Sequence, residues 1–235
     1  MKLLITRPEP DATATAERLI GLGYECLSLP ATEIVTTGNA IPSDKVAALL
    51  ATSANAFRTM TRADIERLSS TPLHCVGEKT AKIAREMGFL SVHVAGGSGT
   101  KLVSNIKAHY PLHARFIYLT GSPRKPTVET ELKAAGYQVT SVELYQAQAV
   151  SAWPGPMIIS LAGIDAALHF SRASVETLLV LAEQSGHIAE IKRLPHFCLS
   201  DDVAYPLREA HCPTVATAME ANEKSLLDLV AHLLP

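Results

Sequence analysis

An internal repeat constrains the fold of this chain more than any other feature. Residues 2–34 and residues 115–148 each contain an apolar run, a threonine with arginine and proline nearby, an amphipathic segment that ends at Gly-Tyr, and a second extended run. A further echo follows each copy, as in residues 47–49 and residues 166–168. The repeat has a period of roughly 115 to 123 residues, which is too long for a solenoid and is typical of a duplicated α/β domain.

The order of the segments predicts the fold class. Short apolar runs, typical of strands buried in parallel sheets, lie at 3–6, 26–29, 46–51, 73–76, 91–95, 116–119 and 139–142. Amphipathic segments that predict helices lie at 11–22, 55–60, 81–87, 101–109, 127–135 and 223–234. Such alternation indicates parallel sheets covered on both faces, and 235 residues suffice for two such bodies. We therefore predict two similar flavodoxin-like or Rossmann-like α/β domains.

Local signals mark the ends of these elements and the crossings between the two bodies. Asp11 suits the N-cap of the first helix, and Gly23 suits the left-handed position that ends it. Two extended segments, at about 31–42 and 145–156, are predicted to connect the bodies, and the second has no charged residue. The repeat alone would divide the chain into residues 1–112 and 113–235.

Composition and charge exclude several classes of protein. Hydrophobic residues make up 47% and charged residues 19%, and no stretch is apolar enough for a membrane span. The 21 Lys and Arg against 23 Asp and Glu favour neither a nucleic-acid surface nor a polybasic membrane patch. The chain also opens without a secretory signal, so we expect a cytoplasmic protein whose partner is a small molecule.

The cysteines and histidines predict no metal site. The four cysteines are single and far apart, with no CxxC pair and no Cys-His cluster at metal-ligand spacing, so we expect buried reduced thiols. The nine histidines are scattered, and there is no HExxH motif. His74 and His196 occupy matching strand positions and are expected in the sheets or the core.

Hydroxyl side chains gather where the strands are predicted to end. Ligands of doubly wound sheets bind at the carboxyl ends of the strands, where helix N-termini favour anions. The residues just after predicted strands include Thr6, Thr52, Ser53, Thr80, Thr120, Ser122, Ser171 and Ser200. Any one of them could be only a helix N-cap, but their recurrence in both halves favours a ligand with several carboxylates or phosphates.

Two loops and one tyrosine are further site candidates. The loop at 95–100, AGGSGT, lacks the spacing of a P-loop or of a dinucleotide fingerprint. The basic loop at 121–125 fits either a carboxylate site or a solvated loop. The repeat places Tyr145 at the crossing between the halves, where it could be an acid, a hydrogen-bond donor or only a packed linker residue.

The chain resembles the uroporphyrinogen-III synthase family over essentially its whole length. The resemblance rests on the order Thr6-Arg7-Pro8, Leu19 with Gly23, Pro30, Thr52-Ser53-Ala54-Asn55-Ala56, Val76-Gly77 with Thr80-Ala81, Leu132 with Gly136, Leu144-Tyr145, and Phe170-Ser171. It implies cyclisation of hydroxymethylbilane, a linear tetrapyrrole rich in carboxylates, with inversion of ring D and loss of water, in heme biosynthesis. It implies no metal or organic cofactor, and we expect a monomer.

The resemblance also implies the site and the topology. Tyr145 matches the tyrosine thought to help hydroxide leave, and the substrate-binding candidates are Thr6, Arg7, Thr52, Ser53, Asn55, Gly77, Thr80, Ser171, Arg172 and Ser200. Residues 1–36 would join residues 152–235 in one domain, residues 39–149 would form the other, and the connectors would pair as a two-stranded β-ladder. The active site would lie in the interdomain cleft.

The second half departs from the family pattern at two places. Ser200-Asp-Asp stands where a GxxTA motif is common, so we expect no direct ligand role for Asp201 and Asp202. Ser171 is followed by Arg172, which is a candidate clamp for a carboxylate. The rival interpretation is a two-lobed protein that binds a polyanionic small molecule without transforming it. A nucleotide-sugar or NAD enzyme is disfavoured because the fingerprint is missing.

Overall fold

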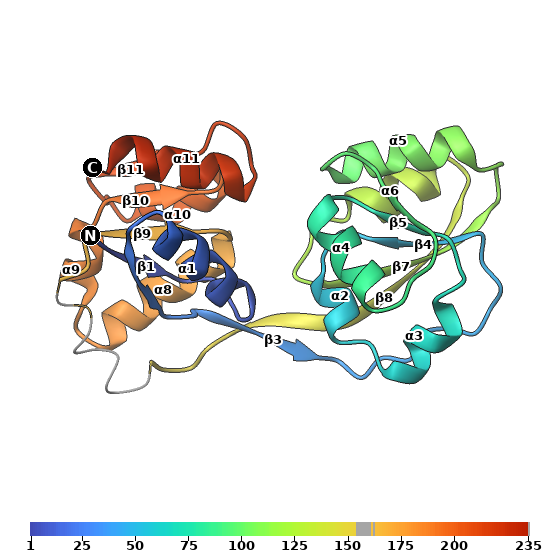
Figure 1. Ribbon diagram of the computed structural model, residues 1–235, viewed down its shortest axis with the longest axis horizontal. Helices are drawn as coiled ribbons and strands as arrows, with labels where there is room; N and C mark the ends of the chain where they lie inside the picture. The colour runs from blue at the N-terminus through green and yellow to red at the C-terminus, as the bar shows by residue number, and fades with distance from the viewer. Residues whose placement is uncertain (154–160, 162, 235) are drawn as a thin grey trace. The chain divides into compact units, whose positions relative to one another are not determined.

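The structure, a computed structural model, describes residues 1–153, 161 and 163–234. The chain divides into two compact units. Unit 1 comprises residues 1–33 and 148–235, and unit 2 comprises residues 34–147. Each unit holds one sheet with helices on both faces (Figure 1). The predicted class, two parallel α/β bodies, is confirmed.

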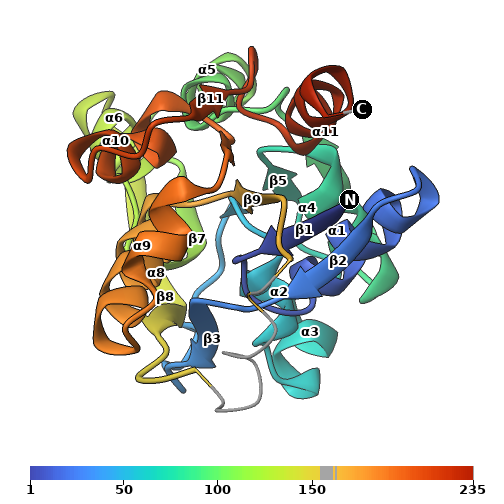
Figure 2. The same cartoon turned by 90° about the vertical axis from the view of Figure 1, so that its left-hand side faces the viewer.

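Unit 1 is built on a parallel sheet in the order β11-β10-β9-β1-β2 (Figure 2). Its strands are β1 (Lys2–Ile5), β2 (Glu25–Ser28), β9 (Ala166–His169), β10 (His196–Cys198) and β11 (Val215–Thr217). Its helices are α1 (Asp11–Gly21), α8 (Arg172–Gln184), α9 (Ile188–Arg193), α10 (Asp201–Glu209) and α11 (Glu223–Leu233). The strand order is that of flavodoxin-like folds.

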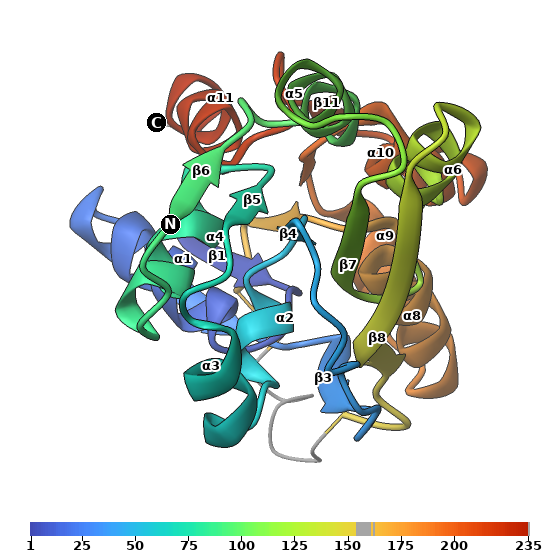
Figure 3. The same cartoon turned by 90° about the vertical axis from the view of Figure 1, so that its right-hand side faces the viewer.

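Unit 2 carries a sheet in the order β3-β8-β7-β4-β5-β6 (Figure 3). Its strands are β3 (Thr32–Thr36), β4 (Ala48–Ala51), β5 (Leu73–Cys75), β6 (Val92–Val94), β7 (Arg115–Ser122) and β8 (Gln138–Ala149). Its helices are α2 (Asn55–Arg58), α3 (Arg62–Leu68), α4 (Glu78–Glu86), α5 (Gly99–His109) and α6 (Thr127–Ala134). Apart from β3, the paired strands run parallel.

The two sheets share one strand order once the repeat is taken into account. β7 and β8 of unit 2 correspond to β1 and β2 of unit 1, and β4, β5 and β6 correspond to β9, β10 and β11. Unit 2 is therefore a circular permutation of unit 1. In each unit the direction of strand order reverses between two central strands, β1 and β9 or β7 and β4, and ligands of such sheets bind at this reversal.

Apolar side chains of each sheet pack under helices on both faces. In unit 1, α1 and α11 cover one face, while α8 and α9 cover the other (Figure 2). In unit 2, α2, α3 and α4 cover one face, while α5 and α6 cover the other (Figure 3). This double cover explains why the strand segments are continuous apolar runs such as Ala48–Ala51, all of which are buried.

The ends of the first helix differ in part from the prediction. Pro10 occupies the N-cap position, and Asp11 is the first helical residue, where its carboxylate binds Arg7. The prediction of Asp11 as N-cap is therefore wrong, because the five N–H donors of the arginine compete for the carboxylate. Gly23 has a φ of 92°, the left-handed conformation predicted for it.

Both predicted connectors contribute backbone pairs to the edge of the unit 2 sheet. β3 neighbours β8, the amide of Thr37 donates to the carbonyl of Leu144 at 3.0 Å, and the amide of Val150 donates to that of Ala31 at 3.1 Å. The predicted two-stranded ladder is thus present between residues 31–37 and 144–150. Residues 154–156, the end of the second connector, lie outside the described residues. No helix in the described part of the chain is long and apolar enough to cross a membrane.

Candidate active site

Tyr145 lies near the carboxyl end of the unit 2 sheet, on β8. Its Cα is paired with that of Gly121 on β7, after a shift in strand register. The ring is half-buried and packs against the core that includes Leu119 and Leu144. Tyr145 is therefore held by the sheet itself and not by a free connector.

The environment of Tyr145 keeps its phenol protonated. Burial raises the pKa of Tyr145, and the Tyr118 hydroxyl adds to this, whereas a hydrogen bond with Ser53 and the charge of Arg124 act in the opposite direction. The net pKa lies above the ordinary value. A phenol that holds its proton at neutral pH can donate that proton to a leaving group.

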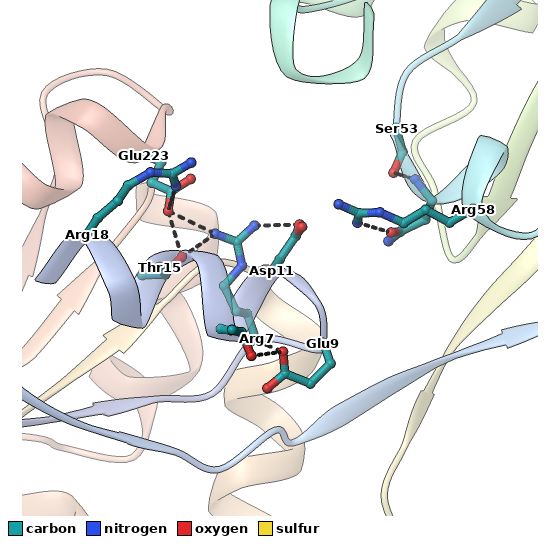
Figure 4. Close-up of polar contacts among 10 residues, drawn as sticks. Arg7, Glu9, Asp11, Thr15, Arg18, Ser53, Arg58 and Glu223 are labelled. Atoms are coloured by element: carbon teal, nitrogen blue, oxygen red, sulfur yellow. Dashed lines mark hydrogen bonds and ion pairs between the residues drawn. The ribbon is translucent and has the colours of Figure 1, made fainter. Parts of the chain in front are cut away.

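Ser53 is oriented by the first turn of α2. Its Oγ accepts a hydrogen bond from the amide of Asn55 at 3.2 Å (Figure 4). Because a hydroxyl that accepts from the backbone still has its own O–H, Ser53 can donate to Tyr145. A donor at the phenol oxygen stabilises the phenolate, which agrees with the downward effect of Ser53 on the pKa of Tyr145.

Thr52 and Asn55 make contacts beside Ser53. The hydroxyls of Thr52 and Tyr118 lie 2.9 Å apart, so Thr52 joins the end of β4 to β7. Arg58 donates to Oδ1 of Asn55 at 2.8 Å, which fixes the amide on the first turn of α2 (Figure 4). The three neighbouring predictions around residue 53 therefore fall in one polar cluster.

Gly77 and Thr80 lie at the start of α4, which follows the neighbouring strand β5. Gly77 is the N-cap, with φ −138° and ψ 163°, and no described side chain caps this helix. A Cβ added to Gly77 would have no neighbour within 4 Å among the described atoms, chain neighbours aside. Thr80, in the first turn, is 7% exposed. The helix start therefore presents open space beside uncapped backbone N–H groups.

In the basic loop after β7, Arg124 is paired with carboxylates of its own unit. The guanidinium donates to Glu129 at 2.9 Å, contacts Glu143 at hydrogen-bond distance, and lies 3.4 Å from the carbonyl of Gly121. Two carboxylates thus match its charge, and their hydrogen bonds raise the pKa of Arg124 against the effect of burial, which would lower it. Arg124 anchors the loop to α6 and β8.

In unit 1, Thr6 ends β1 as part of a buried polar chain. Its hydroxyl lies 3.1 Å from Nδ1 of His169, and Nε2 of His169 lies 2.9 Å from Nδ1 of His196. Nε2 of His196 lies 3.1 Å from the carbonyl of Ile191, which can only accept a hydrogen bond. Because the Ile191 carbonyl needs a donor, the proton of His196 is on Nε2, and its Nδ1 must accept from Nε2 of His169. The proton of each neutral ring is therefore on Nε2. Thr6 therefore donates to His169, and the prediction that His196 is a sheet residue is confirmed.

Arg7 is enclosed by acceptors of its own unit. Its guanidinium binds Asp11 at 2.9 Å and Thr15 at 3.0 Å, and it lies 3.4 Å from Glu223 (Figure 4). It also stacks 4.1 Å above the ring of Phe170. These contacts join the loop after β1 to α1, α11 and the loop after β9.

Ser171 and Arg172 begin α8. Ser171 is the N-cap, with its Oγ accepting from the amide of Ser174 at 3.2 Å. Arg172 binds Glu176 at 2.8 Å and lies 4.9 Å above the ring of Tyr205. The capping function of Ser171 is established by these contacts, and the charge of Arg172 is matched on its own helix.

Ser200 begins α10 in the way that Gly77 begins α4. It is an extended N-cap residue, and no described side chain caps the helix. The acidic residue after each cap is drawn to an arginine two turns along: Asp201 to Arg208 at 2.9 Å, and Glu78 to Arg85 at 2.7 Å. The repeat thus extends to the ion pairs at the uncapped helices.

Comparison of the sequence with models of protein families identifies the family of this chain. A family model described as uroporphyrinogen-III synthase HemD matches residues 13–228. The chain belongs to that family. It is accordingly a synthase of the lyase type, in porphyrin and heme biosynthesis. A search of curated proteins gave no match.

Two solved structures of uroporphyrinogen-III synthases have the same fold. The enzyme of Helicobacter pylori 26695 aligns with a TM-score of 0.68 at 16% identity, covering 99% of both chains. A mutant enzyme of Thermus thermophilus aligns with a TM-score of 0.55 at 18% identity, covering 99% of this chain and 98% of its own. At such identities the likeness concerns the fold.

The predicted synthase residues form two sets, one in each unit. The set in unit 2 consists of Thr52, Ser53, Asn55, Gly77 and Thr80, which follow β4 and β5, and Tyr145, which lies within β8 opposite the end of β7. The set in unit 1 consists of Thr6, Arg7, Ser171, Arg172 and Ser200, after β1, β9 and β10. Both sets lie at the carboxyl ends of parallel strands, which is where ligands bind in this class of fold.

Sequence reasoning missed several partners in the synthase sets. Tyr118, Glu223 and His169 were not singled out as partners of Thr52, Arg7 and Thr6, because each comes from a distant part of the chain. The repeat offered one signal, since residues 118 and 120 follow the same pattern as residues 4 and 6. In the described ranges, no group of three or more His, Cys, Asp or Glu is placed to hold a metal ion.

Proposed function

We propose that the protein converts hydroxymethylbilane to uroporphyrinogen III, with Tyr145 as the acid that assists loss of hydroxide. The observation that carries this role is the half-buried phenol of Tyr145, whose pKa is raised by burial and whose oxygen is hydrogen-bonded to Ser53. Ser53 accepts from the Asn55 amide and keeps its own O–H. In this proposal that O–H donates to the phenol oxygen, which leaves the phenol proton directed to another acceptor.

The proposed first step breaks the bond between the hydroxymethyl carbon and its oxygen. The electron pair of that bond leaves with oxygen, the Tyr145 proton joins it, and water and an azafulvene cation form. The phenolate left behind is stabilised by the Ser53 hydroxyl and by the charge of Arg124, the two groups that lower the pKa of Tyr145.

Ring closure follows without further help from the phenol. The substituted carbon of ring D attacks the azafulvene and gives a spiro intermediate, which fragments and recloses with ring D inverted. The macrocycle then releases a proton as its last pyrrole ring regains aromaticity, and this proton restores the Tyr145 phenol. The net change is loss of one water from the substrate.

We propose that the substrate carboxylates are bound at the uncapped starts of α4 and α10. First-turn N–H groups without side-chain caps offer hydrogen bonds to an anion, and the helix dipole favours negative charge there. At both helices an arginine further along draws the neighbouring carboxylate away, through Glu78–Arg85 and Asp201–Arg208. Gly77 adds open space, so a carboxylate can reach the backbone of α4 closely.

In this proposal Arg7 and Arg172 hold the strand ends and helix starts of the site in place, and they are not the main ligands of the substrate carboxylates. The charge of Arg7 is matched by Asp11 and Glu223, and that of Arg172 by Glu176. Thr6, Thr52 and Ser171 each make a hydrogen bond within their own unit. These contacts hold the strand ends in place, which supports catalysis by orientation of a flexible substrate.

The experiment is an isomer analysis with freshly prepared hydroxymethylbilane. The tetrapyrrole is incubated with the protein, oxidised, and separated into uroporphyrin I and uroporphyrin III. We expect isomer III in proportion to the protein concentration, while a protein-free sample gives isomer I by spontaneous closure. Binding of the tetrapyrrole with isomer I as the sole product would contradict the enzymatic proposal and favour a binding protein.

A further inference from the structure

The ring of Tyr145 occupies the place where Gly121 would carry a side chain. A Cβ built on Gly121 would lie 2.2, 2.3 and 2.6 Å from Cζ, Cε2 and Cε1 of Tyr145. These three atoms form the hydroxyl end of the ring. Because carbon atoms in ordinary contact are about 3.5–4.0 Å apart, only glycine at position 121 lets the phenol end lie against β7.

The backbone at Gly121 has no separate need for glycine. The left-handed φ values among the described residues belong to other positions, such as Gly23 and Gly136, and Gly121 is not one of them. An alanine could adopt its extended strand conformation without backbone strain. The feature that excludes a side chain is therefore the Tyr145 ring itself.

A register shift between β7 and β8 brings Tyr145 to this position. Thr120 is paired with Glu143, but the next residue, Gly121, is paired with Tyr145, so Leu144 is an extra residue on β8. In a regular strand, neighbours point to opposite faces. Here Leu144 and Tyr145 both pack against the core that also contains Val142. The shift thus turns the phenol to the face of β7 on which Gly121 leaves room.

The carbonyl of Gly121 is held in turn. Nη1 of Arg124 lies 3.4 Å from it, and the same guanidinium binds Glu129 and Glu143. The backbone beneath the ring is therefore anchored to α6 and β8. A ring that rests on an anchored strand has a defined distance to Ser53, the partner of its hydroxyl.

We propose that Gly121 is a positioning residue for Tyr145, which together with the register shift sets where the phenol proton is delivered. This inference rests on the proposed acid role of Tyr145 for its effect on rate. The position of the Tyr145 ring against Gly121 does not depend on that role. An alanine methyl would drive the hydroxyl end of the ring outward by more than about 1 Å to reach an ordinary carbon–carbon contact.

The test is the variant Gly121→Ala. A misplacement of about 1 Å can cost on the order of 100-fold in rate, so we expect a loss of that size in kcat for isomer III, with a smaller change in KM. We also expect the pKa of Tyr145 to move back toward its ordinary value, because the displaced ring is less buried. Burial is the largest cause of the raised pKa, and its reduction outweighs the loss of the Ser53 hydrogen bond, which acts in the opposite direction. Tyrosinate absorbance, taken as the difference between each protein and its Tyr145→Phe counterpart, measures that pKa.

The matched control is Gly21→Ala. Position 21 also lacks a left-handed φ, and an added Cβ there meets no described atom within 4 Å, so we expect wild-type kcat and Tyr145 pKa. A second control is the pair of variants Tyr145→Ala and Gly121→Ala/Tyr145→Ala. If the ring is the obstacle, these two should have equal unfolding midpoints in urea, whereas Gly121→Ala alone lowers the midpoint.

The outcomes separate this proposal from the role of Tyr145 in catalysis. An unchanged rate for Tyr145→Phe would remove the acid role, while the titration and the urea midpoints would still decide the geometry. Gly121→Ala with an unshifted Tyr145 pKa would overturn the positioning proposal. So would a failure of Gly121→Ala/Tyr145→Ala to fold when Tyr145→Ala folds, because glycine would then serve another need.

Discussion

Glu223, the first residue of α11, lies 2.7 Å from Arg18 of α1 and also accepts a 2.6 Å hydrogen bond from Thr15 (Figure 4). The same carboxylate oxygen is 3.4 Å from Arg7, so one glutamate joins the C-terminal helix to the N-terminal helix and to the loop after β1. The first and last helices of the chain are therefore connected by charge as well as by apolar packing.

Glu223→Gln should destabilise the protein in a pH-dependent way. Burial alone would raise the pKa of Glu223, but the hydrogen bond from Thr15 and the charges of Arg7 and Arg18 outweigh it and lower the pKa. A lowered pKa means that the stabilisation is present at neutral pH and is lost as the pH falls through the lowered pKa. We expect about 1–3 kcal/mol less unfolding free energy at pH 7, and a smaller difference near pH 3.

Urea denaturation at both pH values measures this effect. Glu66→Gln is the control, because its ion pair with Arg62 lies at the surface, with 65% of the Glu66 side chain exposed. We expect no measurable loss there. Equal losses for the two variants would contradict a special role for Glu223.

Tyr145→Phe should reduce the rate of isomer III formation by about 10²- to 10⁴-fold, the usual range for a lost general acid. The Phe ring keeps the packing on β7, so the unfolding free energy should change by only about 1 kcal/mol, for one hydrogen bond. Stopped assays with isomer separation give the rate, and urea denaturation gives the stability. Wild-type kcat in this variant would exclude Tyr145 from the chemistry.

Gly77→Ala tests whether a ligand approaches the start of α4. The extended φ of Gly77 and the open space around it allow a methyl group, and loss of a glycine N-cap costs about 1 kcal/mol at most. A substrate carboxylate at the backbone would meet that methyl, so we expect KM to rise about tenfold, equivalent to about 1.4 kcal/mol. Steady-state kinetics give KM for Gly77→Ala and the wild type, and urea denaturation gives their stabilities. An unchanged KM would mean that the carboxylate binds elsewhere.

The buried histidine pair should make unit 1 sensitive to acid. Burial lowers the pKa of His196 from 6.5 to about 4, and burial together with His196 lowers that of His169 well below its ordinary value. The unfolded chain then binds more protons than the folded protein, so stability is full above pH 6.5 and falls as the pH drops toward 4. Each group contributes about 1.4 kcal/mol per pH unit within its window.

The variant His196→Gln removes one of these groups and should flatten the slope of unfolding free energy against pH between 6.5 and 4. The side-chain amide can still donate to the Ile191 carbonyl. His232→Gln, on the exposed face of α11, is the control and should keep the wild-type slope. A slope unchanged by His196→Gln would show that His196 does not titrate in this range.

The helices with a clear apolar period, and the residues that end them, could be predicted from the sequence. The register between neighbouring strands could not. The helix at 127–135 was expected from its pattern and observed at 127–134, because local signals set its limits. By contrast, nothing local marks Leu144 as the extra residue of a register shift, since that depends on how β8 meets β7. The helices α3, α8 and α9 were also missed. In α3 and α9, one or two turns give too few repeats of an apolar face, whereas α8 has 13 residues and its length does not explain the miss.

The same limit applies to the candidate site. Ser53, Gly77 and Ser200 could be placed after strands from the sequence, because strand ends and helix starts follow local patterns. The ion-pair partners that determine the role of an arginine could not be predicted from the sequence. From the sequence, the loop with Arg124 fitted either a carboxylate site or a solvated loop, yet Glu143, on the strand beyond the next helix, forms an ion pair with Arg124. Such pairs form only when the sheet assembles.

The split of unit 1 across the chain has a consequence for synthesis. β1 has an early neighbour in β2, but Leu3 also pairs with Ala166, so the other edge of β1 must wait for β9, made more than 160 residues later. At about 5–20 residues per second, the wait is roughly 8–30 s. Unit 2 is continuous and can complete its sheet in that interval, which brings residues 33 and 148 together and shortens the loop that unit 1 must close. We expect nascent chains that stop before residue 166 to hold a protease-resistant middle and a cleavable amino terminus.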